Sequence, residues 1–237
     1  MTSTAESLAL RGASVFVKAG AHETVDLAAR ELARYLLLLT GEPSTLEHQW
    51  PETGTVCAVT VDPDMAQKLG TAPGDVGEQG FRLKAFEHEG VCGVAVVAAH
   101  PVGALYGVYT LLEKLGMGFY FGGDTFPDVD EARDASVSAD LDCTMTPAFG
   151  ARGNMLHYTF LVGPTTWGLE DYKFYFDQLA RMRANLLLMH WYDNEPGGFY
   201  EVDGQVLAGG PAPNSLSKPW GALAASRTSQ FSFGTGD

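Results

Sequence analysis

The first 150 residues alternate between short apolar runs and longer segments in which apolar residues return every three or four positions. Residues 13–20 and 55–61 predict strands, because they are short, rich in valine and bounded by turn-forming residues. Residues 22–40 predict a helix that ends at Gly41. Its apolar stripe consists of Val25, Ala28, Ala29, Leu32, Leu36 and Leu39. Residues 62–79, rich in Pro, Gly, Asp and Thr, predict a loop.

The next segment predicts a hairpin followed by a second helix. Two alternating runs flank His88-Glu89-Gly90, which indicates a β-hairpin with the glycine at a position of positive φ. Pro101 then occupies the first turn of a helix, a position that proline favours, and Gly116 ends it. The predicted buried face of this helix consists of Leu105, Val108, Leu111, Leu112 and Leu115. A short strand over residues 117–121 and a loop over 122–128 complete a small α/β module.

The second part of the chain predicts a strand, a helix and another strand. The first strand lies around residues 154–158, and the helix runs from about Leu169 to Ala184. Its apolar face consists of Tyr172, Tyr175, Phe176, Leu179 and Met182, with acids in the first turn and Arg181 and Arg183 in the last. Asn185 predicts the helix stop, since asparagine tolerates the left-handed conformation. A small hairpin is predicted around Asp203-Gly204.

The run "LLLMHWYD" predicts a buried parallel strand with a polar tip. Its first four residues are apolar on both faces of the strand, as in a buried parallel sheet. A strand–helix–strand unit of this length begins either a doubly wound sheet or a (β/α)8 barrel. In both folds, function lies beyond the C-terminal ends of the strands. His157 and Tyr158 end the first strand, and residues 190–193 end the second. We therefore expect His157, His190, Trp191 and Asp193 to face a cleft.

The length, charge and apolar content of the chain limit the kinds of partner that it can bind. The chain has 237 residues, which fits one large domain or one ordinary domain plus part of another. Its net charge of -14 argues against nucleic acid and anionic membranes, because both attract basic surfaces. No apolar run reaches the roughly 20 residues needed to span a bilayer. The N-terminal stretch lacks a cationic segment followed by an apolar one, so we expect no signal peptide and a cytoplasmic location.

Motifs for cofactors and metals are missing from the sequence. Cys57, Cys92 and Cys143 lie far apart without a CxxC spacing, and we expect all three to fill the core. The glycines match neither the dinucleotide fingerprint nor the P-loop, and no G-x-S-x-G elbow occurs. The sequence therefore predicts no cofactor, and it gives no support to a doubly wound phosphate-binding enzyme or to a serine hydrolase of the elbow type.

The hairpin and second helix resemble a known accessory domain. The segment "GFRLKAFEHEGVCGVAVVAAHPVGALYGVYTLLEKLG" is similar to the N-terminal accessory domain of β-N-acetylhexosaminidases and α-glucuronidases, which share a G-x-x-Y-G-x-x-T-L-L helix. Here that pattern falls on Gly103, Tyr106, Gly107 and 110–112, where the two glycines let backbones approach closely. The resemblance implies a zincin-like α+β fold over residues 1–142 with a structural role. The sequence lacks the zinc-binding motif HExxH, so we expect no metal ion in this domain.

The resemblance continues into the second part. "ARGNMLHY" and "LARMRANLLLMHWYD" are similar to the opening of the catalytic (β/α)8 barrel in the same glycosidase superfamily. The resemblance implies that Arg152 binds sugar hydroxyls. It also implies that Asp193 supports the catalytic residues without contacting the substrate itself. After Asp193, hexosaminidases continue to a Trp-Arg pair, whereas this chain has "NEPGGFYE". This departure leaves an α-glucuronidase-like or other related glycosidase open.

The chain after Gly150 is far shorter than the roughly 250 residues of a (β/α)8 barrel. We expect residues 143–237 to form only the first strands of the barrel, without a general acid and without complete catalysis. Two alternatives stay open: a non-catalytic carbohydrate-binding or structural module, and one half of a split barrel that a partner chain completes. The split barrel would expose apolar strands and promote self-association.

Overall fold

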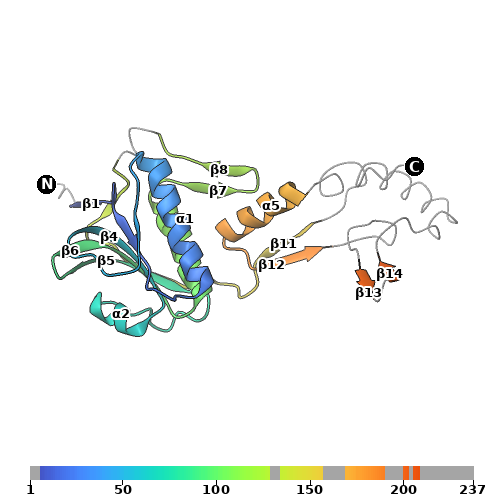
Figure 1. Cartoon of the computed structure of the whole chain (residues 1–237), viewed down its shortest axis with the longest axis horizontal. Helices are drawn as coiled ribbons and strands as arrows, with labels where there is room; N and C mark the ends of the chain where they lie inside the picture. Colours follow the sequence, from blue (N-terminus) through green and yellow to red (C-terminus); the bar gives the residue numbers. More distant parts are fainter. Residues whose placement is uncertain (1–5, 129–133, 157–168, 190–199, 203–204, 209–237) are drawn as a thin grey trace. The chain divides into compact units, whose positions relative to one another are not determined.

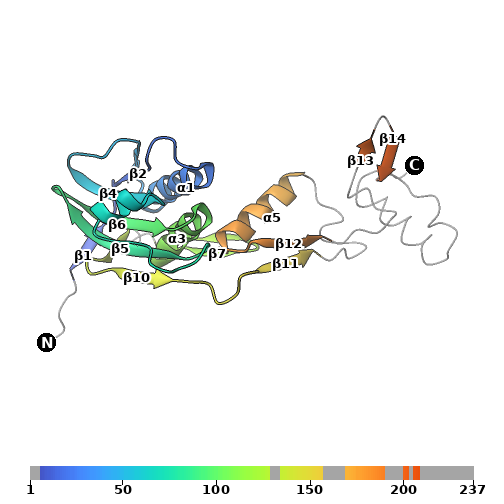
Figure 2. The same cartoon turned by 90° about the horizontal axis from the view of Figure 1, so that it is seen from below.

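The computed structural model describes residues 6–128, 134–156, 169–189, 200–202 and 205–208 (Figures 1 and 2). It forms two compact units. The first unit comprises Met1–Gly150 together with Arg181–Arg183, and the second comprises Ala151–Ala180 and Ala184–Asp237.

A six-stranded mixed sheet is the centre of the first unit. Its strands are β2 (Ser14–Phe16), β3 (Leu46–Glu47), β4 (Gly54–Thr60), β5 (Phe81–His88), β6 (Val91–Ala98) and β10 (Asp142–Met145), in the spatial order β10-β5-β6-β4-β2-β3. Strands β3, β2, β4 and β6 run parallel, and β5 is antiparallel to both β6 and β10. The strands predicted before and after the first helix are confirmed, whereas the two-residue β3 is too short for an alternating pattern.

Helices cover both faces of this sheet (Figures 1 and 2). α1 (Glu23–Thr40) and α3 (Pro101–Lys114) share one core with the sheet, and the predicted stripes of both helices are buried in it. α2 (Pro63–Lys68) packs on the opposite face, against Phe16, Val56 and Ala58. The prediction of a continuous loop over residues 62–79 is therefore wrong. Asp62 caps α2 and Pro63 occupies its first turn, but six residues give no readable helical period.

Two glycines of α3 lie against neighbouring backbone and side chains, as predicted. A Cβ at Gly103 would come 2.4 Å from the carbonyl oxygen of Gly80, and one at Gly107 would come 2.5 Å from Val96 Cγ1. Gly116 adopts a φ of 94° directly after the helix end, which confirms it as the stop.

The predicted hairpin is confirmed, with a two-residue turn. His88 pairs with Val91, so Glu89 and Gly90 form the loop between β5 and β6. Both residues have positive φ, 51° and 79°, which is typical of a type I′ turn. Glutamate is an unfavourable residue for the first of these positions.

Substituting Glu89→Asn is expected to raise the free energy of unfolding by about 0.5–1 kcal/mol, because Asn-Gly is the preferred type I′ pair. Thermal unfolding followed by circular dichroism measures this change. Glu87→Asn serves as the matched control, since Glu87 is an exposed residue of β5 where asparagine has no advantage. Equal effects of the two substitutions would contradict the assignment of the turn.

Two small antiparallel sheets complete the first unit. β1 (Ser7–Ala9) pairs with β9 (Ser136–Ser138), and β7 (Gly118–Tyr120) pairs with β8 (Gly123–Thr125). The strand predicted at residues 117–121 is confirmed, but β8 lies where a loop was predicted. Its sequence, Gly-Asp-Thr, has no hydrophobic residue, so no alternating pattern marks it.

The cysteines follow the core prediction only in part. Cys57 is buried, and burial raises the pKa of its thiol to about 12, so it is unreactive. Cys92 is exposed and Cys143 is half-buried, which makes the prediction wrong for Cys92. Among the described residues, no group of His, Cys, Asp and Glu is placed to hold a metal ion. Within the same residues, no helix combines the length and apolarity required to cross a bilayer.

The second unit contains the predicted parallel strand–helix–strand arrangement. β11 (Gly153–Leu156) pairs in parallel with β12 (Leu186–Met189), and α5 (Leu169–Arg181) lies between them in sequence. β13 (Tyr200–Val202) and β14 (Gln205–Ala208) form the predicted antiparallel hairpin.

Helix α5 differs from the prediction in its face and in its end. Tyr175 and Leu179 are buried as expected, but Phe176 is 41% exposed. The helix ends at Arg181, and the left-handed residue is Arg183, with a φ of 60°, rather than Asn185. The structure uses Asn185 instead to begin the pairing with β11, because its backbone N–H donates to the carbonyl of Arg152.

Candidate functional site

The C-terminal ends of β11 and β12 lie side by side, since Leu156 pairs with Met189. His157 and His190 are the next residues in the sequence after this pair. These two histidines, together with Trp191 and Asp193, lie outside the described residues. The parallel pairing that the sequence predicted is therefore confirmed, and the cleft role of the four side chains stays a prediction.

Arg152 lies at the other end of β11, directly before its first residue. Its backbone N–H donates to Asn185 Oδ1 over 2.8 Å, and its carbonyl accepts from the backbone N–H groups of Asn185 and Leu186. The asparagine side chain thus extends the ladder between the two strands by one bond. The structure brings Arg152 and Asn185 together through the backbone, and sugar binding by the Arg152 side chain stays a prediction.

The glycine of the Arg-Gly pair has a packing role. A Cβ at Gly153 would come 1.8 Å from the carbonyl oxygen of Leu186. Any side chain there would separate β11 from β12, because the obstacle is backbone rather than a rotatable side chain. The Arg-Gly motif therefore combines a strand-packing requirement at residue 153 with a candidate ligand contact at residue 152.

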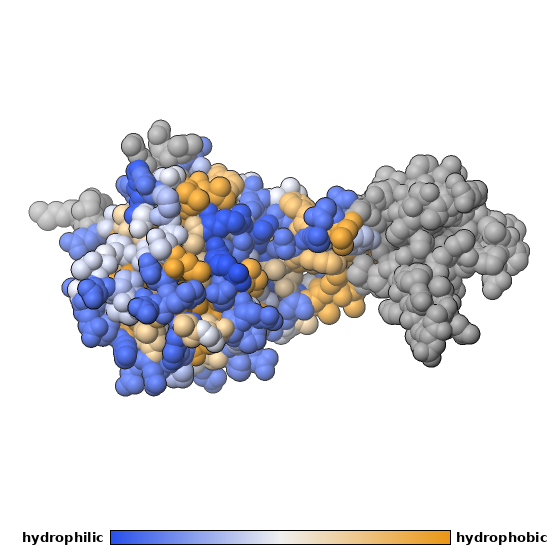
Figure 3. All heavy atoms as spheres, in the orientation of Figure 1, coloured by the Kyte–Doolittle hydropathy of each residue, from blue (hydrophilic) through white to orange (hydrophobic). Residues whose placement is uncertain are grey.

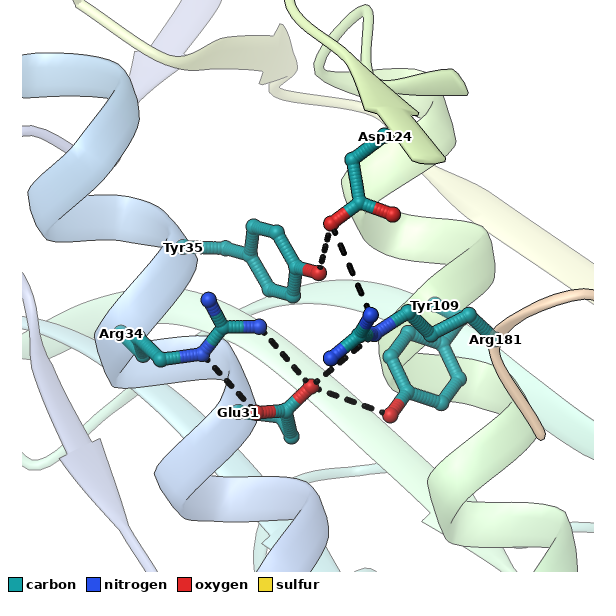
Figure 4. Close-up of polar contacts among 6 residues, drawn as sticks. All are labelled: Glu31, Arg34, Tyr35, Tyr109, Asp124 and Arg181. Atoms are coloured by element: carbon teal, nitrogen blue, oxygen red, sulfur yellow. Dashed lines mark hydrogen bonds and ion pairs between the residues drawn. The ribbon is translucent and has the colours of Figure 1, made fainter. Parts of the chain in front are cut away.

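A cluster of charged and phenolic side chains in the first unit was not predicted as a site (Figure 4). We call it the arginine cluster. Its six members come from α1, α3, β8 and the end of α5: Glu31, Arg34, Tyr35, Tyr109, Asp124 and Arg181.

Two carboxylates hold the arginine cluster together. Glu31 accepts from Arg34 Nε at 2.9 Å, from Arg34 Nη2 at 3.1 Å and from the Tyr109 hydroxyl at 3.2 Å. Arg181 lies between the carboxylates, with Nε 3.6 Å from Glu31 and Nη1 3.8 Å from Asp124. The Tyr35 hydroxyl donates to Asp124, and the Arg34 guanidinium lies 4.0 Å from the centre of the Tyr35 ring.

Burial and neighbouring charges shift the pKa values of three side chains in the arginine cluster. Burial raises the pKa of Tyr35, and its hydrogen bond to Asp124 adds to this effect. The pKa of Tyr109 is raised by burial and by the negative charge of Glu31. Burial alone would lower the pKa of Arg181, but the charges around it outweigh that effect and raise it. Both tyrosines therefore stay neutral donors and Arg181 stays a cation across the physiological pH range.

Arg183 makes a second link within the same unit. Its Nη1 and Nη2 atoms donate to the two carboxylate oxygens of Glu113 over 2.8 and 2.9 Å, in a bidentate pair. Its Nη1 also lies 3.4 Å from the hydroxyl of Thr110, a residue of the G-x-x-Y-G-x-x-T-L-L motif. Two arginines, two positions apart, thus fix residues 181–183 to α1, α3 and β8.

The arginine cluster is suited to holding segments in place rather than to catalysis. Each carboxylate faces an arginine and a tyrosine hydroxyl, so its oxygens are engaged in contacts between separate elements. Sequence reasoning explained Arg181 and Arg183 only by the helix dipole and missed their partners. The partners lie between about 60 and 150 positions away in the sequence, and only the spacing of Glu31 and Arg34 gives a local signal.

Comparison with known proteins finds a family model that matches part of the first unit. Residues 3–111 match a family model described as the N-terminus of glycosyl hydrolase family 67. No curated protein matches the chain. The chain thus matches the N-terminal part of a glycoside hydrolase, as its sequence predicted.

Several solved glycosidases are similar in structure. A family GH115 4-O-methyl-α-glucuronidase with specificity for decorated arabinogalactans is 16% identical, with a TM-score of 0.56, over 77% of this chain and 25% of that one. The N-acetyl-β-hexosaminidase of Streptomyces plicatus is 20% identical, with a TM-score of 0.49, over 92% and 40%. The GH20 enzyme of Streptomyces coelicolor is 19% identical, with a TM-score of 0.48, over 94% and 43%. The chain thus spans less than half of each structure, and these identities concern the fold alone.

Proposed function

We propose that this chain is the N-terminal part of an enzyme that hydrolyses O-glycosidic bonds. Residues 1–142 act as its accessory domain, and residues 143–237 begin its (β/α)8 catalytic barrel. The observation that carries this proposal is the order of the parts: a unit matched by the family 67 N-terminus is followed by the parallel pair β11–α5–β12. A parallel strand–helix–strand unit of this kind is the repeat from which a (β/α)8 barrel is built.

The barrel assignment gives the candidate residues their roles. His157, His190, Trp191 and Asp193 follow the C-terminal ends of adjacent strands, where (β/α)8 enzymes bind substrate. Trp191 offers a ring for stacking on a sugar face, and Asp193 orients a neighbouring histidine. Arg152 precedes β11 and lies at the opposite end of this strand, so we propose no contact between it and a sugar held by these four residues.

Exposed apolar side chains on the second unit support further barrel strands. Leu186 and Leu188 on β12 are 42% and 52% exposed, and Met155 on β11 is also exposed. Figure 3 shows apolar side chains on the surface over these strands. Glycoside hydrolysis normally needs two carboxyl groups flanking the scissile bond. In our proposal this chain supplies sugar contacts, and the general acid comes from barrel strands that pack beside β12.

For the substrate we favour an α-glucuronoside. The resemblance of the sequence to α-glucuronidases and the structural similarity to a 4-O-methyl-α-glucuronidase both favour this class. The sequence after Asp193 lacks the Trp-Arg pair of hexosaminidases, which argues against an N-acetylhexosaminide.

Binding of glucuronic acid to the 237-residue chain tests this function, measured by ligand-observed NMR. We expect weak binding that Trp191→Ala reduces about fivefold, because the indole ring is the proposed stacking surface for the sugar. Asp193→Ala should weaken it by a smaller factor. Arg11→Ala is the control without effect, since Arg11 forms a surface pair with Glu42 in the first unit. A folded chain that binds no glucuronic acid, or binds it equally well as Trp191→Ala, would contradict the proposal.

Hydrolysis of a chromogenic α-glucuronide separates the catalytic part of the proposal from the binding part. We expect no turnover by this chain alone, because in our proposal the general acid comes from other barrel strands. Turnover that disappears in Asp193→Ala would place the catalytic machinery within these 237 residues and would refute our assignment of the acid to other strands.

A further inference from the structure

A crevice in the first unit lies between two neighbouring strands whose following helices pack on opposite faces of the sheet. Strands β2 and β4 are parallel neighbours. The chain leaves β2 for α1 on one face of the sheet and leaves β4 for α2 on the opposite face. In open α/β sheets this divergence opens a crevice beyond the strand ends, and ligands bind there.

The structure has a hollow of about 440 Å³ at this point, within the usual range for small-molecule sites. It is lined by residues 18–22 after β2, by residues 59–63 at the end of β4 and just beyond it, and by Val25 of α1. Its walls are mostly small and apolar, from Ala19, Ala21, Val59, Val61 and Pro63. All of these residues belong to the first unit.

A fixed charge pair forms the polar side of the crevice. Lys18 donates from Nζ to Asp62 Oδ2, and Asp62 Oδ1 accepts from the backbone N–H groups of Asp64 and Met65. The hydrogen bond from Lys18 lowers the pKa of Asp62, which keeps the pair ionised at neutral pH. The capping bonds fix the carboxylate, while the exposed ammonium keeps two further N–H donors for a ligand.

His22 adds a third polar group to the crevice. Its Nδ1 accepts from the backbone N–H of Thr24 at 3.2 Å, so the neutral ring carries its proton on Nε2. The lining therefore offers donors from Lys18 and His22, an acceptor from Asp62, and apolar walls, with a net charge near zero.

We propose that this crevice binds a small neutral polyol, such as a monosaccharide. An ammonium paired with a carboxylate presents a donor next to an acceptor, which matches vicinal hydroxyl groups. The apolar walls match the C–H face of a sugar ring. An anion would have to displace Asp62 from Lys18, and a divalent cation would find one carboxylate only. The proposal does not depend on the activity proposed for the barrel.

Titration of the ¹⁵N-labelled 237-residue chain with D-glucose tests the proposal by NMR. We expect saturable shifts of the amides of residues 18–22 and 59–62, with dissociation constants in the millimolar range. Lys18→Met is expected to weaken binding at least fivefold, and Ala19→Trp to abolish it by filling the mouth. Asp62→Asn keeps the helix cap, so its loss of binding would reflect the lost carboxylate. Lys114→Met, at the exposed end of α3, is the control without effect.

The same titration contains the results that would overturn the proposal. Unchanged amides at these positions with 100-fold molar excess of glucose, a protein that binds D-glucuronate but not glucose, or equal binding by Ala19→Trp would each refute it. Shifts confined to the second unit would instead support the proposed barrel site and refute the crevice. The two proposals therefore fail independently.

Discussion

Replacing Gly103 by alanine is expected to lower the free energy of unfolding of the first unit by about 3 kcal/mol. The new Cβ would lie 2.4 Å from the carbonyl oxygen of Gly80 and 3.0 Å from Ala98 Cβ. The first obstacle is backbone at the start of β5, so relief requires moving the hairpin against α3. This cost exceeds the gain of up to about 1 kcal/mol that alanine brings to a helix interior.

Hydrogen exchange of the β4 and β6 amides in urea measures this loss, because these strands form the centre of the first unit. Gly122→Ala is the matched control, since a Cβ there meets nothing within 4 Å and its φ is not in the left-handed region. It should leave the stability within about 0.5 kcal/mol of the parent. Gly107→Ala should cost less than Gly103→Ala, because its nearest contact is the Val96 side chain. The reverse order would contradict the close-approach argument.

Glu31→Ala is expected to destabilise the same unit by about 3 kcal/mol, because it leaves Arg34, Arg181 and Tyr109 without a shared acceptor. The Glu31 side chain is only 15% exposed, so water compensates little for the lost carboxylate. Glu31→Gln keeps an acceptor for Tyr109 and should cost roughly half as much. The protection of amides in residues 181–183 should fall together with global stability.

Glu42→Ala provides the comparison for this prediction. Glu42 pairs with Arg11 at 2.9 Å, a similar distance, but its side chain is 49% exposed. Its removal should change the stability by no more than about 0.5 kcal/mol. If Glu31→Ala and Glu42→Ala lower the free energy of unfolding by the same amount, the arginine cluster contributes no more to stability than an ordinary surface ion pair.

The arginine cluster gives the G-x-x-Y-G-x-x-T-L-L helix of the first unit a second structural role. Gly103 and Gly107 bring α3 close to the sheet, while Thr110 and Glu113 on the same helix receive Arg183. One helix thus packs on its own sheet and also fixes residues 181–183, which directly follow the body of α5. This arrangement fits the structural role that the resemblance to glycosidase accessory domains implied.

The sequence by itself determined the elements that carry a strong local signal. α1 and α3 each present an apolar stripe over 14 or more residues, and a Glu-Gly turn between alternating runs defined the β5–β6 hairpin. The parallel pair β11–β12 also followed from the sequence, because a helix between two apolar runs makes a parallel crossover the natural pairing. The Gly103 and Gly107 spacing likewise predicted close packing.

Only the tertiary structure decided the features that depend on strand order and on distant partners. β3, β8 and α2 are too short to show a period, and Cys92 has the same local pattern as a buried residue. The crevice between β2 and β4 exists because their helices lie on opposite faces, and Arg181 meets Glu31 across 150 positions of chain. Local patterns report which face of an element is apolar, whereas charge pairing and crevices depend on which elements become neighbours.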